Sequence, residues 1–207
     1  MKTKIVNLYE FGELSESSKE KARQWFREAS QGDSFWSECV IEEAKEQGTN
    51  MGLKIEDIYF SGFYSQGSGA CYTGSWSAAD VKSGETAKDW GDSPATKEIR
   101  RIASEFEQFA KDWAESSFSV THSGHYSHEY CTNFEISLGE DADNNEKVSP
   151  EQWREASDSI IETARDYMRW IYKQLEKEYE YQNSDECIDE NITANSFTFL
   201  ADGTRED

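Results

Sequence analysis

The sequence predicts an α+β fold: a single domain over residues 1–207 in which an antiparallel sheet of hairpins packs against several helices, including one long C-terminal helix. Three observations support this class. Both prolines follow a serine at the head of a segment with helical periodicity, other stretches alternate as half-buried strands do, and 7 Trp, 10 Tyr and 11 Phe are enough for a core. Helices in blocks between antiparallel hairpins are typical of the α+β class.

The first half of the chain contains a short strand, two helices and a hairpin. Strand propensity is found at 5–11, and apolar residues at helical spacing predict helices over 16–30 and 34–47. The predicted inward residues of these helices are Ala22, Trp25, Phe26, Ala29, Trp36, Val40 and Ala44. Alternating stretches at 54–60 and 71–77 predict a hairpin around a glycine-rich connection.

The two Ser-Pro pairs predict the starts of the two longest helices. Serine is a good N-cap and proline fits the first helical position, so helices begin after Ser93 and Ser149, the second with Gln152 completing a capping box. The first helix has an apolar stripe of Ile99, Ile102, Ala103, Phe106, Phe109, Ala110 and Trp113. The second has Trp153, Ile160, Ala164, Tyr167, Met168, Ile171, Leu175 and Tyr179.

The remaining elements lie around and after these helices. Residues 130–138 alternate as a half-buried strand, and 118–122 supply its partner across a turn that opens at Ser123-Gly124. A short acidic helix over 185–193 and a strand at 196–200 follow. The stretch Asp141–Lys147 and the tail from Ala201 have the composition of a solvated loop and a frayed end.

The formal net charge of -21 bears on which partners this protein can bind. Successive blocks 1–50, 51–100, 101–150 and 151–207 carry -3, -2, -7 and -9, so most of the excess is in the second half. Such a surface repels phosphates, which argues against direct nucleic-acid binding and predicts a basic partner.

Other sequence signals concern the protein's location, the state of its cysteines and its capacity for catalysis. No apolar run approaches the roughly 20 residues of a membrane span, so we expect no membrane contact and a cytoplasmic protein. Four cysteines without a C-x-x-C pair predict buried free thiols. Neither a G-x-S-x-G elbow nor an H-E-x-x-H motif occurs, so we expect no enzyme, no catalytic residues and no cofactor.

The most distinctive string is Ser61-Gly62-Phe63-Tyr64-Ser65-Gln66-Gly67-Ser68-Gly69-Ala70. A phosphate-binding loop needs glycines that lead into a helix N-terminus, and a Walker loop also needs Lys followed by Ser or Thr. Neither condition is met. We predict that Gly62–Gly69 is a hairpin connection, with Phe63 and Tyr64 exposed toward a partner.

All three histidines, His122, His125 and His128, fall in one short stretch. If the turn is centred on His125, His122 and His128 face each other across the hairpin and Cys131 points to the opposite side. Two or three imidazoles, with no evident groups to orient them by hydrogen bonds, are more typical of residues in a turn and at its rim than of a metal site.

Acidic residues gather in two places in the second half. Glu151, Glu155, Asp158, Glu162 and Asp166 share one helix face about 5–6 Å apart, comparable with the roughly 6–7 Å between phosphates on a strand. Bases follow on that face, and internal pairs such as Glu162 with Arg165 neutralise part of it. The second cluster interleaves acids with tyrosines, a composition that suits Arg and Lys side chains: Glu176, Glu178, Tyr179, Glu180, Tyr181, Asp185, Glu186, Asp189 and Glu190.

The glycine-rich string, His128-Glu129-Tyr130-Cys131 and the segment Glu178-Tyr179-Glu180-Tyr181 resemble a family of small acidic proteins of tailed phages and prophages. Most members are uncharacterised and some are labelled antitoxin. This chain departs from the family by Ser68, where Asp is more usual, and by its histidines at 122 and 125. The resemblance implies a phage accessory protein.

Together these lines predict a phage-encoded, non-enzymatic inhibitor of a bacterial defence system, of the anti-CRISPR or anti-restriction type. Its acidic surface would block a basic nucleic-acid-binding protein or complex in the cytoplasm of the bacterial host. Two alternatives stay open: an antitoxin that neutralises a co-encoded toxin, and a small metal-dependent enzyme that uses the His122/His125/His128 hairpin.

Overall fold

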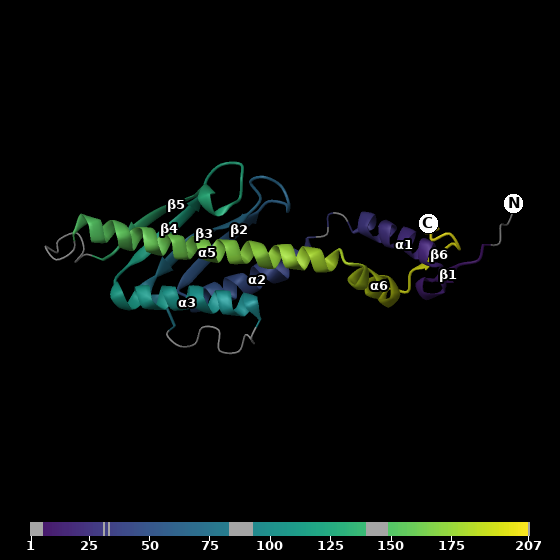
Figure 1. The fold of residues 1–207 in the computed structure, drawn as a ribbon, viewed down its shortest axis with the longest axis horizontal. Coiled ribbons are helices and arrows are strands. Elements are labelled where there is room, and N and C mark those ends of the chain that lie inside the picture. Colours follow the sequence, from purple (N-terminus) through teal and green to yellow (C-terminus); the bar gives the residue numbers. More distant parts are fainter. Residues whose placement is uncertain (1–5, 31, 33, 83–92, 140–148, 207) are drawn as a thin grey trace. The chain divides into compact units, whose positions relative to one another are not determined.

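The computed structural model describes residues 6–30, 32, 34–82, 93–139 and 149–206. Contacts divide the chain into two compact units: unit 1 is Met1–Glu38 with Lys177–Asp207, and unit 2 is Cys39–Glu176. The α+β class, the antiparallel sheets and the long C-terminal helix are confirmed (Figure 1).

Unit 2 is built on a four-stranded antiparallel sheet. Its strands are β2 (Leu53–Phe60), β3 (Ala70–Ser77), β4 (Ser117–His122) and β5 (Thr132–Ser137), in the order β2-β3-β4-β5. Both predicted hairpins are therefore confirmed. The register pairs Phe60 with Ala70, so the connection between β2 and β3 is the glycine-rich string.

One face of this sheet forms the core of unit 2. Trp76, Phe118 and Ile136 are aligned across β3, β4 and β5, and the Trp76 ring contacts Phe106 and Phe109 of α3 (Pro94–Asp112). Figure 1 shows α3 and α5 (Pro150–Gln182) on one side of the sheet. The opposite face of β3 and β4 carries small polar side chains, which leaves the helices on the apolar side.

The two Ser-Pro helix starts are confirmed. Ser93 Oγ accepts a hydrogen bond from the Thr96 amide at 3.2 Å. At the start of α5, Gln152 N donates to Ser149 Oγ at 3.1 Å and Ser149 N donates to Gln152 Oε1 at 2.9 Å, a complete capping box.

The apolar stripe of α5 is buried in its centre and exposed at its ends. Ile160, Ala164, Met168, Ile171 and Leu175 are buried, and buried Tyr167 donates its hydroxyl to the carbonyl of Ala44 on α2 (Phe35–Asn50). Contrary to prediction, Trp153 and Tyr179 are 39% and 37% exposed, because they lie in the first and last turns of the helix.

Unit 1 packs α1 (Glu16–Ala29) with α6 (Asp185–Ala194) and a two-stranded sheet of β1 (Tyr9–Glu10) and β6 (Thr198–Phe199). Its core brings both ends of the chain together and consists of Phe11, Leu14, Ala22, Ile188, Ile192 and Phe199. Trp25 and Phe26 pack against it as predicted, whereas Ala29 is exposed at the end of α1. Short 3-10 helices within the described residues are Phe11–Glu13 in unit 1 and Ala78–Asp80 and Glu129–Cys131 in unit 2.

The C-terminal tail is ordered against α1, so the prediction of a frayed end from Ala201 is wrong. Ser18 Oγ donates to the Ala201 carbonyl at 2.8 Å. The Arg205 guanidinium lies 4.6 Å from the ring centre of Trp25 and 4.4 Å from that of Phe197. These contacts hold the polar tail in place, although its composition alone does not predict them. The predicted loop Asp141–Lys147 lies outside the described residues.

The cysteines are free thiols but not all are buried. Cys71 and Cys187 are buried, Cys131 is partly buried, and Cys39 is exposed on α2, which corrects the prediction for that residue. Burial raises the pKa of Cys71 to about 12. None of the helices in the described ranges is both long and apolar enough to cross a membrane.

Candidate functional site

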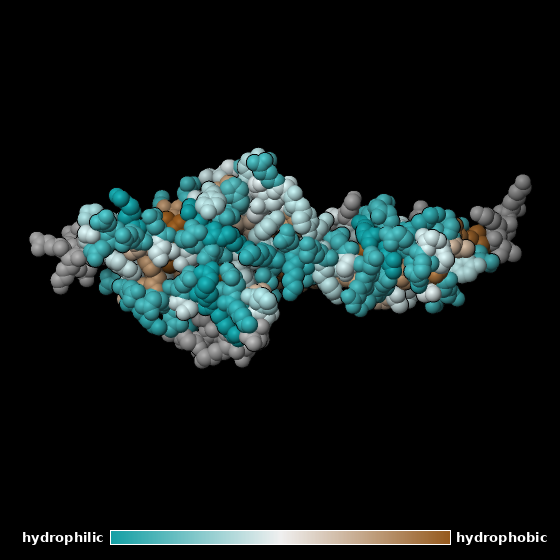
Figure 2. Space-filling view, in the orientation of Figure 1, coloured by the Kyte–Doolittle hydropathy of each residue, from teal (hydrophilic) through white to brown (hydrophobic). Residues whose placement is uncertain are grey.

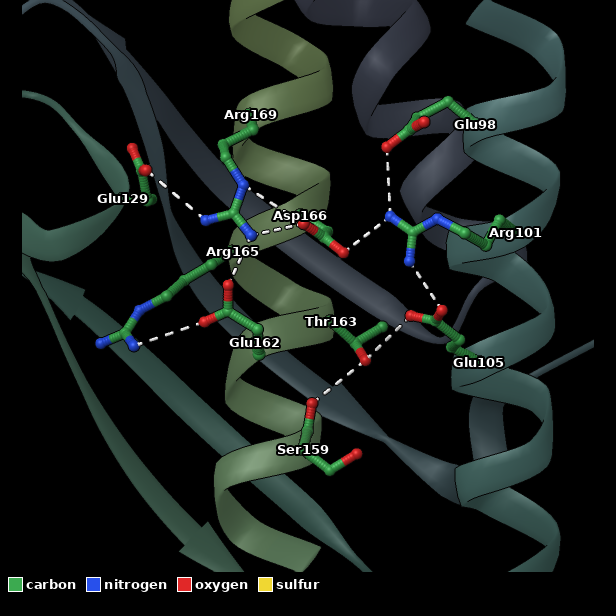
Figure 3. A network of polar contacts seen from close by, with 10 residues as sticks. All are labelled: Glu98, Arg101, Glu105, Glu129, Ser159, Glu162, Thr163, Arg165, Asp166 and Arg169. Carbon is green, nitrogen blue, oxygen red and sulfur yellow. Dashed lines mark hydrogen bonds and ion pairs between the residues drawn. The ribbon is translucent and has the colours of Figure 1, made fainter.

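Helices α3 and α5 run antiparallel in unit 2 and share a network of ion pairs (Figure 3). Arg101 of α3 donates to Asp166 of α5 at 2.6 Å and to Glu105 at 2.6 Å. Arg169 bridges Asp166, Glu162 at 2.6 Å and Glu129 at 3.5 Å. The guanidinium groups of Arg101, Arg165 and Arg169 are surrounded by the five carboxylates of the network: Glu98, Glu105, Glu129, Glu162 and Asp166.

A groove of about 440 Å³ lies beside this network. We call it the α3–α5 groove; its lining residues are Arg101, Glu105, Gln108, Phe109, Asp112, Ser159, Glu162, Thr163 and Asp166. Four of these side chains are carboxylates and one is a guanidinium, so the lining is acidic. Such a groove favours cationic groups over anions.

The predicted carboxylates of α5 form a continuous row that leads into this groove. Glu151, Glu155 and Asp158 are exposed and form no ion pair within the part of the chain that the structure describes. Glu162 and Asp166, one and two turns further on, line the groove and are bound by arginines. We call these five residues the α5 carboxylate row. Figure 2 shows hydrophilic residues over most of the visible face of α5.

The predicted terminal cluster is divided by the fold. Glu176 belongs to unit 2, and the remaining members belong to unit 1. Asp189 accepts two hydrogen bonds of 2.7 Å from Arg23, and Asp185 pairs with Arg27, both on α1. Glu178 accepts a hydrogen bond from Gln182, and the Tyr179 ring packs 5.7 Å from Trp36. Tyr181, Glu186 and Glu190 stay exposed.

The glycine-rich loop packs against the histidine loop that joins β4 to β5. A Cβ atom at Gly69 would lie 2.5 Å from His128 Cβ, and one at Gly67 would lie 3.1 Å from the Tyr126 ring. The loop is therefore a structural connection, as predicted. Of its two aromatic residues, Tyr64 is 71% exposed, while Phe63 lies 5.4 Å from the ring of Tyr172 on α5.

The predicted geometry of the histidine hairpin is wrong. The register pairs His122 with Thr132, so His122 and His128 do not face each other across the strands. His122 Nε2 lies 2.9 Å from the Tyr126 carbonyl, and His128 Nε2 lies 3.4 Å from Cys131 Sγ. The short helix Glu129–Cys131 turns Cys131 back toward His128, which strict alternation of a longer strand does not allow. No described group of three or more His, Cys, Asp or Glu side chains is placed to hold a metal ion.

Sequence reasoning missed the half of the groove that comes from α3. Glu98, Arg101, Glu105, Gln108 and Asp112 recur at three and four residues on the polar side of α3. That spacing is the available signal, but it does not show which helix this face lies beside. The contact of Arg101 with Asp166 spans 65 residues and exists only in the folded unit.

Asp166 makes the network sensitive to pH. Partial burial acts to raise the pKa of Asp166, but the hydrogen bonds from Arg101 and Arg169 outweigh it and hold this pKa below its ordinary value. The ionised carboxylate therefore stabilises the fold above the unfolded pKa, near 3.9, and this contribution is lost as the pH falls through the lower folded value.

We expect Asp166→Asn to lower the free energy of unfolding by about 1 to 2 kcal/mol at neutral pH. The difference from wild type should begin to shrink below roughly pH 4, where the carboxyl of the unfolded wild-type chain takes up a proton, and should vanish below the lower pKa of the folded state. Urea unfolding at several pH values measures this. Asp158→Asn, which removes an exposed charge from the same helix, is the control and should have almost no effect; equal effects of the two variants would contradict the assignment.

Comparison with known proteins identifies a family but no function. No curated protein and no solved structure matches this chain. Residues 36–185, which are 150 of the 207 residues and include the α3–α5 groove and both loops, match the model of a family described as a domain of unknown function. The chain therefore belongs to this family, DUF8835.

Proposed function

We propose that this chain is a non-enzymatic binding protein that uses the α5 carboxylate row and the α3–α5 groove to bind a basic surface of another protein. The observation that carries the proposal is the continuity of the row. Exposed carboxylates at Glu151, Glu155 and Asp158 lead directly into a groove with an acidic lining. The row attracts a cationic partner over several turns, and the groove accommodates its side chains.

The spacing of the row favours a partner that normally binds nucleic acid. Carboxylates at successive helical turns are about 5–6 Å apart, close to the spacing of phosphates along a strand. A protein surface that binds a phosphate backbone therefore offers basic side chains at a compatible spacing. The resemblance to small acidic phage proteins supports the narrower proposal that the partner is a bacterial defence complex, blocked in the manner of an anti-CRISPR or anti-restriction protein.

The test uses a triple charge reversal, Glu151→Lys, Glu155→Lys and Asp158→Lys. Wild-type and variant proteins are immobilised and exposed to bacterial lysate, and bound proteins are eluted between roughly 0.1 and 1 M NaCl. We expect basic nucleic-acid-binding proteins on the wild type, eluted by salt, and a loss of at least about tenfold on the variant. DNA or RNA should compete for the same captured proteins.

A matched control separates a local surface from overall charge. Glu42→Lys, Glu46→Lys and Asp57→Lys reverse three exposed carboxylates on α2 and β2 and change the net charge by the same amount. This control should keep the partner. Equal loss in both triple variants, or capture that nucleic acid does not compete with, would contradict the proposal. Circular dichroism verifies that both variants are folded.

A further inference from the structure

A strip of aromatic rings in unit 2 reaches the α5 carboxylate row at one end, through Arg165. It consists of His125, Tyr126, His128 and Tyr130, and we call it the ring strip. Successive ring centres are 5.5, 6.4 and 6.1 Å apart, and Tyr126 and His128 are nearly parallel. Tyr126 is 55% exposed and Tyr130 is 62% exposed, so their rings are open to a ligand.

The ring strip is supported by the glycine-rich loop beneath it. The Tyr126 ring lies over Gly67 so closely that a Cβ atom there would be 3.1 Å from it, and the backbone of His128 lies against Gly69. His128 Nδ1 also accepts the amide of Tyr130 at 3.1 Å. Rings held in this way lose little conformational freedom when a ligand binds, which is typical of recognition surfaces.

Arginine already binds one end of the strip. The guanidinium carbon of Arg165, on α5, lies 4.9 Å from the ring centre of Tyr130, and Arg165 pairs with Glu162 of the α5 carboxylate row at 3.8 Å. The strip and the row therefore meet at this residue. A guanidinium stacked on a tyrosine ring is the contact that a second, incoming arginine would repeat on Tyr126.

We propose that the partner is recognised through arginine side chains, whose guanidinium planes stack on Tyr126 and Tyr130 while the α5 carboxylate row attracts them. This inference rests on the proposed function and adds a preference for arginine over lysine. Bases of single-stranded nucleic acid also stack on aromatic strips. Unit 2, however, has 26 acidic and 13 basic residues, and this charge favours the cationic peptide.

The test compares labelled hexaarginine and hexalysine peptides by fluorescence polarisation at physiological salt. Both carry the same charge, so the α5 carboxylate row attracts both, whereas only guanidinium groups stack well on tyrosine. We expect hexaarginine to bind wild type at least about fivefold more tightly than hexalysine. In the double variant Tyr126→Leu and Tyr130→Leu this ratio should fall to within about twofold, with hexalysine affinity unchanged.

Two further variants make the outcome decisive. Tyr126→Phe with Tyr130→Phe keeps the ring faces and should keep the arginine preference. The α5 triple reversal should weaken both peptides equally. Equal binding of the two peptides to wild type, a preference that survives the leucine variant, or tighter binding of an oligothymidine would each overturn the inference. Salt-insensitive binding that the α5 reversal leaves unchanged would instead contradict the proposed function, and absence of binding by either peptide would contradict both.

Discussion

Replacing Gly74 with alanine is expected to lower the free energy of unfolding by about 3 kcal/mol or more, a large effect for one added methyl group. Gly74 lies in the middle of β3 with φ +143°, a conformation that residues with a Cβ rarely adopt. An added Cβ would also lie 2.1 Å from the Lys54 carbonyl oxygen and 3.1 Å from Ile55 Cα. The irregular register of β2 between Ile55 and Asp57 brings this backbone so close.

Urea unfolding of Gly74→Ala and Gly62→Ala measures the effect against a matched control. Gly62 lies in the connection after β2, and a Cβ there meets nothing within 4 Å. Its alanine variant should stay within about 1 kcal/mol of wild type. An unfolding midpoint of Gly74→Ala close to that of wild type would show that β2 shifts without cost and that the bulge is not a fixed feature.

Removing Arg23 is expected to loosen unit 1, because this side chain holds α6 to α1. Arg23 is 14% exposed, donates twice to Asp189, and lies 3.8 Å from Asp185 and 5.8 Å from the ring centre of Phe11. The hydrogen bonds that Arg23 donates to Asp189 raise the pKa of Arg23 further, despite partial burial, so it is always charged. Arg23→Ala should cost about 2 to 3 kcal/mol, since it leaves two carboxylates of α6 under-compensated.

Lys21→Ala is the control for Arg23→Ala. Lys21 is also on α1 and pairs with Asp202, but both side chains are more than half exposed, so its loss should cost at most about 0.5 kcal/mol. Hydrogen exchange of α6 amides, together with urea unfolding, compares the two. Faster exchange in α6 confined to Arg23→Ala is the expected result, and similar exchange in both variants would refute the assigned role.

Local sequence signals predicted the elements well because they act within a few residues. The serine caps at Ser93 and Ser149 and the stripe of α3 depend on hydrogen bonds and spacing inside one segment. The histidine loop was predicted incorrectly because its geometry depends on contacts outside its own segment. Its register depends on a short helix at Glu129–Cys131 and on contact with the glycine-rich loop, which lies about 60 residues earlier.

The candidate site was also predictable from the sequence only in part. The α5 carboxylate row was predictable, since helical periodicity places its members on one face. The α3–α5 groove was not, because Arg101 and Asp112 reach it from another helix. The ring strip likewise needs Gly67 and Gly69 beneath it, and nothing in the spacing of either loop indicates that they meet.

By itself, the sequence determined the α+β class, the helix starts and the excess of acid, because these depend on composition and short-range pattern. It also placed -5 of the net charge in the first hundred residues and -16 in the rest. The tertiary structure decided how the acidic and basic residues are distributed in space. Unit 1 holds 16 acidic and 8 basic residues and unit 2 holds 26 and 13, so each has twice as many acids as bases. The physical reason is that Arg23 and Arg27, from the less acidic first half of the chain, fold onto Asp189 and Asp185 near its end, and screened charges act across space, not along sequence.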